Sequence, residues 1–300
     1  MYVVTGATGN IGKVIALELL ANGKKVKVIG RNLEKLKILT DKGAEPLVGD
    51  VYDSAFLKQA FAGAEAAFCM IPPNMQSSDF RADQKKVADN YVNAVKTNNV
   101  KNVLLLSSVG AHLRIGAGVV DGLGYLEEML SEIKNVNVLN LRPGYFFENL
   151  FGQIGTINQL GIIGSAIKAD LNFPMVATKD IAAVAAKRLL DLNFAGNSIE
   201  YVLGSRDLSY NDIARVIGKA IGKPDLKYVQ FSYEDAKNGM VQSGFVSANL
   251  AELFNELSEG FNNGRALNAH TRTSENTSST SIEEFAQGFV NVYNKSHAMA

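Results

Sequence analysis

A glycine-rich turn near the N-terminus is the first segment whose residue types and spacing suit a chemical task. The sequence TGATGNIG places Gly6, Gly9 and Gly12 directly after a strand-like run and at the start of a helical pattern. Gly6 permits a tight turn, Gly9 lets the backbone approach an anion, and Gly12 lets the helix pack closely on the strand. The exposed amides and the helix dipole attract phosphate, and the side chains of Thr8 and Asn10 can add hydrogen bonds. The spacing therefore predicts a binding site for the diphosphate of a dinucleotide.

A basic residue at the end of the second predicted strand indicates which dinucleotide is bound. Many NAD-binding proteins carry an acidic residue about 20 residues after the glycines, where it binds the ribose hydroxyls. In KVKVIGRN this position is held by Arg31, nineteen residues beyond Gly12, and its guanidinium can bind a 2′-phosphate that a carboxylate would repel. NADP(H) is therefore favoured over NAD(H), and Lys35 would make a weaker contribution to binding the 2′-phosphate. The alternative is an exposed arginine at the start of a helix, where the negative charge of nearby Glu34 partly cancels the positive charge of Arg31.

The ends of the third and fourth predicted strands supply two further candidates. Asp50, in GDVYD, can accept a hydrogen bond from the adenine amino group, but Asp50 or Asp53 would serve equally well as a helix N-cap. The run IPPN at 71–74 follows the fourth strand at the carboxyl edge of the sheet, where ligands of such folds bind. Its simpler interpretation is a rigid turn, and both interpretations can hold together.

The bulk composition argues against several other classes of protein. Thirty basic residues balance thirty acidic ones without a long run of one sign, which is not the pattern of a nucleic-acid-binding or membrane-binding surface. Cys69 is the single cysteine, so an internal disulfide or a CxxC metal site is impossible, and the three scattered histidines lack metal-ligand spacing. No signal peptide or membrane-length apolar segment is recognised. We therefore expect a cytoplasmic protein with no metal, no direct nucleic-acid ligand and no membrane attachment.

Short apolar runs alternate with helical patterns from the N-terminus to about residue 143, as in repeated βαβ units. The strands are nearly all apolar, as strands buried on both faces should be. The pattern predicts an α/β fold with a doubly wound, parallel Rossmann sheet. The strands are expected at 2–5, 25–29, 45–49, 66–71, 102–107 and 136–141, and the helices between them at 11–23, 32–43, 54–63, 79–99 and 124–133.

The alternation of apolar runs and helical patterns stops near Leu141, where the segment LRPGYFFENLFGQIG, rich in aromatic residues and glycine, begins. The helix KDIAAVAAKRLLD and the strand SIEYVLG then resume the α/β pattern, and the remaining chain reads as mainly helical with one short strand in LKYVQF. The polar stretch 262–281 has no periodicity, which favours a mobile surface loop over a functional lid. We expect a Rossmann domain made of 1–143 plus 179–205 and a smaller, mainly helical substrate or partner lobe made of 144–178 plus 206–300.

Taken together, these motifs give the chain a resemblance to a known family. TGATGNIG, the arginine after the second strand, GDVYD and RPGYFFEN resemble the NmrA-like branch of the atypical short-chain dehydrogenase/reductase superfamily, and the likeness covers almost the whole chain. The family implies an NADP(H)-preferring Rossmann core with a cleft against a C-terminal lobe. Its members divide between reductases of quinone-type acceptors and non-catalytic redox sensors. The resemblance places Gly6, Thr8, Gly9, Asn10 and Ile11 at the diphosphate, Arg31 at the 2′-phosphate, Asp50 and Val51 at adenine, and Ile71, Pro72, Ser107, Pro143 and Tyr145 along the nicotinamide side.

The helix after the fifth strand departs from the usual short-chain dehydrogenase pattern. Those enzymes place a lysine four residues after a tyrosine, so that the tyrosine can exchange a proton with a carbonyl. Here Met129 stands four residues after Tyr125, and the carboxylates of Glu127 and Glu128 would oppose such a transfer. His112, near the expected carboxyl edge of the sheet, is a second candidate acid, against the alternative of an exposed loop histidine. Tyr125 and His112 are therefore the candidate catalytic residues.

Two functions from different classes fit these observations. The first is NADP(H)-dependent reduction of a flat, electron-poor acceptor such as a quinone, because hydride transfer needs mainly proximity and an oriented nicotinamide. Tyr145 and Phe146 would line the acceptor pocket, or else pack in the core. The second is a non-catalytic redox sensor that binds NADP(H) and acts through a protein partner. A nucleotide-sugar epimerase is a weaker third, since it would normally need the missing Tyr/Lys pair.

Overall fold

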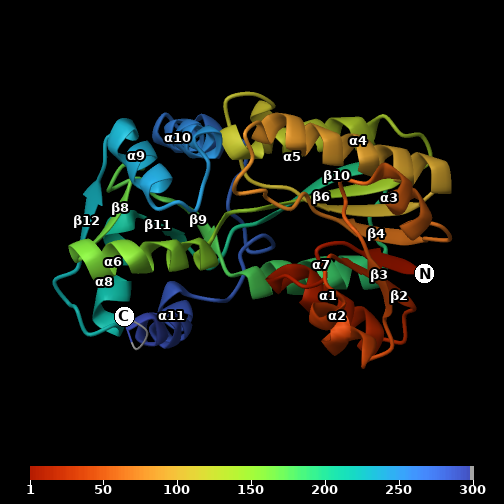
Figure 1. Ribbon diagram of the computed structural model, residues 1–300, viewed down its shortest axis with the longest axis horizontal. Helices are drawn as coiled ribbons and strands as arrows, with labels where there is room; N and C mark the ends of the chain where they lie inside the picture. The colour runs from red at the N-terminus through yellow and green to blue at the C-terminus, as the bar shows by residue number, and fades with distance from the viewer. Residues whose placement is uncertain (298–300) are drawn as a thin grey trace.

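A seven-stranded parallel sheet organises the N-terminal half of the protein. The computed structural model (Figure 1) describes residues 1–297, and the strand order of this sheet is β10-β6-β5-β4-β1-β2-β3. The chain starts in the middle of the sheet, runs outward to β3, and returns across β1 to β4 and beyond, which is the doubly wound topology that the sequence predicts. The strands are β1 (Tyr2–Val4), β2 (Val26–Gly30), β3 (Glu45–Val48), β4 (Ala66–Cys69), β5 (Asn102–Leu106), β6 (Asn137–Pro143) and β10 (Asn197–Val202).

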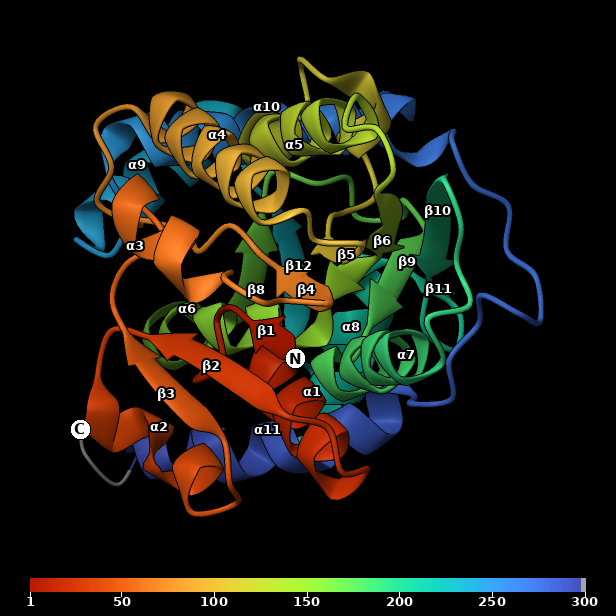
Figure 2. The ribbon, with the colours of Figure 1, turned by 90° about the vertical axis from the view of Figure 1, so that its right-hand side faces the viewer.

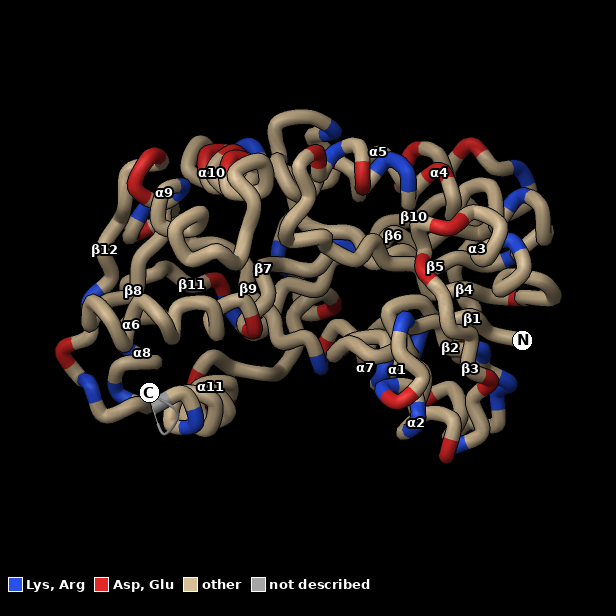
Figure 3. Tube along the Cα trace, viewed as in Figure 1, with Lys and Arg blue, Asp and Glu red and all other residues tan. Residues whose placement is uncertain are grey.

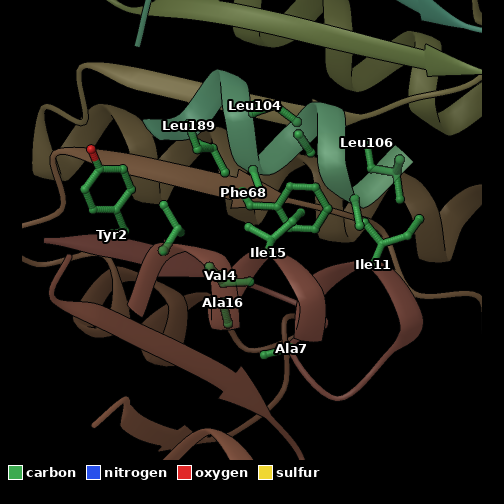
Figure 4. Packing of buried hydrophobic residues seen from close by; sticks show 14 of the residues in the cluster. Tyr2, Val4, Ala7, Ile11, Ile15, Ala16, Phe68, Leu104, Leu106 and Leu189 are labelled. Atoms are coloured by element: carbon green, nitrogen blue, oxygen red, sulfur yellow. The ribbon is translucent and has the colours of Figure 1, made fainter. Parts of the chain in front are cut away.

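Helices cover both faces of this sheet (Figure 2). Tyr2, Val4, Phe68 and Leu189 pack on one face (Figure 4), whereas the intervening Val3 belongs to the apolar cluster on the other face, as the two-residue period of a strand requires. The first face carries α1 (Asn10–Ala21), α2 (Leu33–Thr40) and α7 (Thr178–Asp191), and the second carries α3 (Ser54–Ala60), α4 (Phe80–Asn98) and α5 (Asp121–Ser131).

The C-terminal lobe lies beside the sheet and has its own apolar core, which includes Phe147, Phe173, Tyr210 and Phe289. It is mainly helical, as expected, but it also contains two small sheets, in the orders β11-β9-β7 and β12-β8. Of these strands only β12 was predicted. The elements of the lobe are β7 (Tyr145–Phe146), α6 (Ile154–Leu160), β8 (Ile162–Ser165), β9 (Phe173–Val176), β11 (Asp207–Leu208), α8 (Tyr210–Ala220), β12 (Lys227–Gln230), α9 (Tyr233–Gln242), α10 (Ala248–Asn262) and α11 (Ile282–His297), with 3-10 turns at Phe147–Gln153 and Arg265–Leu267. Two further 3-10 turns, Ala111–Leu113 and Gly118–Val120, lie between β5 and α5.

The polar stretch 262–281 is irregular over most of its length, as predicted, but it is tied to the rest of the molecule. Arg272 donates a hydrogen bond to the carbonyl oxygen of Leu203 at 3.0 Å. The backbone N–H of Leu203 in turn donates to the carbonyl oxygen of Asn276 at 2.8 Å. These contacts hold the stretch against the chain that follows β10 and oppose the free motion expected of it.

Basic and acidic residues are interspersed over both halves of the molecule (Figure 3). Within residues 1–297, no helix has the combination of length and apolar character needed to cross a membrane.

Candidate functional site

A cleft of about 500 Å³ opens at the carboxyl ends of the central strands. It lies where the strand order reverses between β1 and β4, which is the usual ligand position in open α/β sheets. The cleft brings together ten of the predicted site residues, namely Gly6, Thr8, Gly9, Asn10, Ile11, Arg31, Asp50, Val51, Pro72 and Phe146. That these residues bind a cofactor stays a prediction.

The glycine turn after β1 has the backbone geometry expected of an anion-binding loop. Gly6 adopts a φ of +60°, which favours glycine, and a Cβ atom at Gly12 would lie 2.5 Å from the carbonyl oxygen of Gly6. Gly9 is the N-cap of α1 and supplies no side-chain hydrogen bond, whereas Asn32 caps α2 and Asp53 caps α3. The first-turn amides of α1 therefore face the cleft without a capping side chain and can bind phosphate.

Hydrogen bonds to β4 fix the position of this turn. The hydroxyl of Thr5 donates to the carbonyl oxygen of Phe68 at 3.0 Å and accepts from the N–H of Met70 at 3.1 Å. The hydroxyl of Tyr91 donates to the carbonyl oxygen of Met70 at 2.8 Å, and burial raises the pKa of Tyr91 well above its usual value, so this hydroxyl remains a donor. The turn is thus held in place by the protein itself.

Arg31 and Asp50 follow neighbouring strands at one end of the cleft. Within the part of the chain that the structure describes, the guanidinium of Arg31 makes no hydrogen bond or ion pair, so it is available to a ligand. Asp50 accepts from the N–H of Tyr52 at 3.1 Å. Burial, with the charges of Asp83 and Asp50, raises the pKa of Tyr52 to about 12, and the charge of Arg31 opposes this shift. Asp53, not Asp50, is the N-cap of α3.

Four residues assigned to the nicotinamide side lie outside the cleft lining. Ile71 packs in the core on the α4 side of the sheet, and Pro143 is buried at the end of β6. The hydroxyl of Ser107 donates to the carboxylate of Glu127. Tyr145 packs edge-on against Phe173 in the lobe core, with ring centroids 5.8 Å apart. Their contact with a cofactor stays a prediction.

Glu127 belongs to a buried ion pair and not to the surroundings of the Tyr125 hydroxyl. The guanidinium of Arg142 donates to its two carboxylate oxygens at 2.9 and 2.5 Å. Burial on its own lowers the pKa of Arg142, but the hydrogen bonds and the charge of Glu127 outweigh it and raise this pKa overall. The pair joins α5 to β6.

The structure places both candidate acids away from the cleft lining. The hydroxyl of Tyr125 donates to the carboxylate of Asp89 on α4 at 2.8 Å. The Nε2 atom of His112 lies 3.0 Å from the carbonyl oxygen of Arg265 and 3.0 Å from Oδ1 of Asn268. Both of these are acceptors, so Nε2 of His112 is the donor. His112 therefore ties the turn after β5 to the stretch after α10, and a catalytic role for either residue stays untested.

Three polar residues of the cleft lining were not predicted: Glu148, Asn149 and Thr178. The carboxylate of Glu148 accepts from the N–H of Thr178 at 3.1 Å and from its hydroxyl at 2.6 Å. Ala177, the N-cap of α7, offers no side-chain hydrogen bond, so Glu148 caps that helix from a distance. Two features of the sequence could have pointed to these residues: the pair EN in RPGYFFEN, and a helix start that has no capping residue.

Comparisons with known proteins agree with this architecture. An NADPH-dependent quinone oxidoreductase from Escherichia coli superposes with a TM-score of 0.79 at 22% identity, covering 96% of this chain and 99% of that chain. The triphenylmethane reductase of Citrobacter sp., solved in complex with NADP(H), gives 0.76 at 23% identity over 97% of this chain and 100% of its own. A (4-alkanoyl-5-oxo-2,5-dihydrofuran-3-yl)methyl phosphate reductase from Streptomyces griseus is 23% identical over 241 residues, which are 80% of each chain. The model of the NmrA-like family matches residues 2–286, and the chain therefore belongs to the NmrA-like family.

Proposed function

We propose that this protein is an NADP(H)-dependent reductase that delivers hydride to a small, flat, electron-poor acceptor such as a quinone. The observation that carries the proposal is the composition of the cleft along its length. Arg31 lies at one end, the amides of the glycine turn come next to it, and Met70, Leu106 and Phe146 line the other end. A polar, phosphate-binding end joined to an apolar end suits a dinucleotide with a planar acceptor beside its nicotinamide.

The proposal assigns each part of the cleft a task. The N-terminus of α1 would bind the diphosphate, and Arg31 would bind the 2′-phosphate that distinguishes NADP(H) from NAD(H). When bound, the nicotinamide supplies hydride. The apolar side chains of Met70, Leu106 and Phe146 would hold ring and acceptor in contact and exclude water, which gives proximity and orientation.

Proton supply favours a quinone-like acceptor over an ordinary carbonyl. In the described cleft lining there is no histidine, lysine, tyrosine or cysteine that could act as a general acid near neutral pH. A simple carbonyl becomes a strongly basic alkoxide and needs such an acid. The reduced oxygens of a quinone are much weaker bases, so water suffices to protonate them.

The names of the relatives support the class of reaction. The Escherichia coli, Citrobacter and Streptomyces proteins described above are all reductases, and the first is named for quinones. Their acceptors differ, so they support hydride transfer from a nicotinamide more strongly than they support one acceptor.

Steady-state oxidation of NADPH with a panel of quinones tests the proposal. We expect saturable turnover with at least some quinones and a lower KM for NADPH than for NADH. Absence of turnover with every acceptor, together with tight and selective binding of one redox form, would overturn the reductase in favour of a redox sensor. As a specificity control, Arg31→Ala should raise the KM for NADPH and leave the KM for NADH nearly unchanged.

A further inference from the structure

Glu148 is the only charged residue that lines the acceptor end of the cleft in the described chain. The other two charged lining residues, Arg31 and Asp50, follow β2 and β3 at the opposite end. The glycine turn after β1 lies between the two ends, because β1 separates β2 from β4 in the sheet. The cleft therefore has an arginine at its adenine end and a carboxylate at its acceptor end.

The carboxylate of Glu148 is held in place but is not neutralised. Both of its oxygens accept from the N–H of Thr178 at 3.1 Å, and one accepts from the Thr178 hydroxyl at 2.6 Å. Among residues 1–296, no lysine, arginine or histidine forms an ion pair with it. The neighbouring ammonium of Lys179 pairs with Glu284, and the more distant charge of Glu148 makes only a smaller contribution to the raised pKa of Lys179. The positive end of the α7 helix dipole offsets roughly half a unit of the negative charge on the Glu148 carboxylate. A substantial negative charge thus remains at this end.

The surroundings of Glu148 strengthen its effect on a bound ring. Its side chain is half-buried, and it shares the lining with Leu106, Phe146 and Met70. Apolar walls lower the local dielectric, so a fixed charge acts more strongly on a neighbouring charge here than it would on an open surface.

We propose that Glu148 sets a charge preference, so that the acceptor end of the cleft takes cationic acceptors over neutral ones and neutral acceptors over anionic ones. The same carboxylate favours the oxidised, positively charged nicotinamide over the reduced, neutral one. This inference rests on the proposed reductase function and narrows its substrate class. Hydride leaves C4 of the nicotinamide, which is oxidised and becomes positive, and forms a bond to the acceptor, which is reduced. An acceptor whose reacting centre carries the positive charge becomes neutral without a proton, whereas a neutral quinone takes up one proton from water to give the hydroquinone.

The test compares Glu148→Gln with the unmodified protein on three matched naphthoquinones. These carry on the benzo ring a trimethylammonium group, no charged group or a sulfonate, so that the charge lies away from the redox centre. In Glu148→Gln we expect kcat/KM for the cationic quinone to fall by about tenfold through KM, and that for the anionic quinone to rise several-fold. The neutral quinone should change by less than about threefold. Glutamine keeps an acceptor oxygen for Thr178, so the cap of α7 is retained.

A binding measurement without turnover provides the second readout. Calorimetric titration with NADP+ and with NADPH gives the ratio of their Kd values, and Glu148→Gln should shift this ratio by about tenfold against NADP+. Glu148→Asp keeps the charge and should keep both preferences. Asp180→Asn is the matched control, because it removes a carboxylate from the first turn of α7, the helix that Glu148 caps. The Asp180 carboxylate bonds Thr280 and lies outside the cleft lining, so its removal should leave both readouts unchanged.

The outcomes separate this inference from the proposed function. Suppose that the unmodified protein reduces quinones and that Glu148→Gln is folded, with an unchanged Tm. If the substitution then changes neither the acceptor preference nor the ratio of the NADP+ and NADPH Kd values by more than about twofold, the charge preference is wrong and the reductase proposal stands. If the unmodified protein reduces no acceptor, the reductase proposal fails, and with it the acceptor preference.

Discussion

Replacing Arg31 by aspartate tests the cofactor preference at a single side chain. Arg31 is exposed at the end of β2 and lines the cleft beside Asp50. Its guanidinium is unpaired within the described chain, so removing it leaves no partner unsatisfied in the protein. A change in nucleotide affinity would then report the contact with the nucleotide and not a loss of folding.

The expected magnitude follows from two contributions. Loss of a charge-assisted hydrogen bond to the 2′-phosphate costs about 2 kcal/mol. The new carboxylate repels the same phosphate by about 1 kcal/mol more, as for two charges several ångströms apart in water. Together these amount to roughly a hundredfold weaker binding of NADPH. NADH lacks the phosphate, and an aspartate can accept from its ribose hydroxyls, so its affinity should change by no more than about threefold.

Isothermal titration calorimetry of the Arg31→Asp protein with NADPH and NADH measures both affinities. Lys42→Asp makes the same charge change at an exposed site outside the cleft lining and should leave both Kd values unchanged. Equal losses for the two nucleotides in Arg31→Asp would refute the assignment of Arg31 to the 2′-phosphate.

Three further predictions follow from the contacts described above. In Gly12→Ala the new Cβ lies 2.5 Å from the backbone oxygen of Gly6, so we expect a loss of about 2 kcal/mol in unfolding free energy and weaker NADPH binding. Gly155→Ala places its Cβ in open space within α6; it should leave NADPH binding unchanged and should not lower the unfolding free energy, because alanine favours a helix more than glycine does. Arg142→Leu leaves Glu127 buried without its partner, so urea denaturation should show a loss of about 3–5 kcal/mol, and a loss under about 1 kcal/mol would contradict the burial argument. Because the Tyr125 hydroxyl bonds Asp89 outside the cleft lining, Tyr125→Phe should change kcat/KM by less than about twofold, while a hundredfold loss, typical of a removed general acid, would show that it is catalytic.

The Rossmann strands and helices were predictable because their signals are local. Each buried parallel strand is a continuous apolar run, such as AAFC in β4, and the observed ends differ from the predicted ones by a few residues. The short strands of the lobe carry no such signal. Asp207 and Leu208 pair antiparallel with Pro174 and Phe173, and a two-residue strand paired over that distance in sequence has no period to detect.

Part of the candidate site was likewise predictable from local sequence signals, and part was not. The glycine turn and Arg31 were predicted because strand, turn and helix are contiguous in sequence. Glu148 and Thr178, by contrast, lie thirty residues apart in the sequence and are brought together by the parallel pairing of β7 with β9, which ends just before each of them. The same limit applies to Tyr125, whose nearest carboxylate is Asp89 on another helix and not its sequence neighbours Glu127 and Glu128. Side-chain direction on α5 depends on tertiary packing that spacing alone does not reveal.

The measurement that tests the central claim most directly is calorimetric titration of the unmodified protein with NADPH. If the amides at the start of α1 and the guanidinium of Arg31 form a dinucleotide site, one equivalent should bind per chain, more tightly than NADH. Failure to bind either nucleotide would contradict the assignment of the cleft, and the reductase proposal would have no foundation.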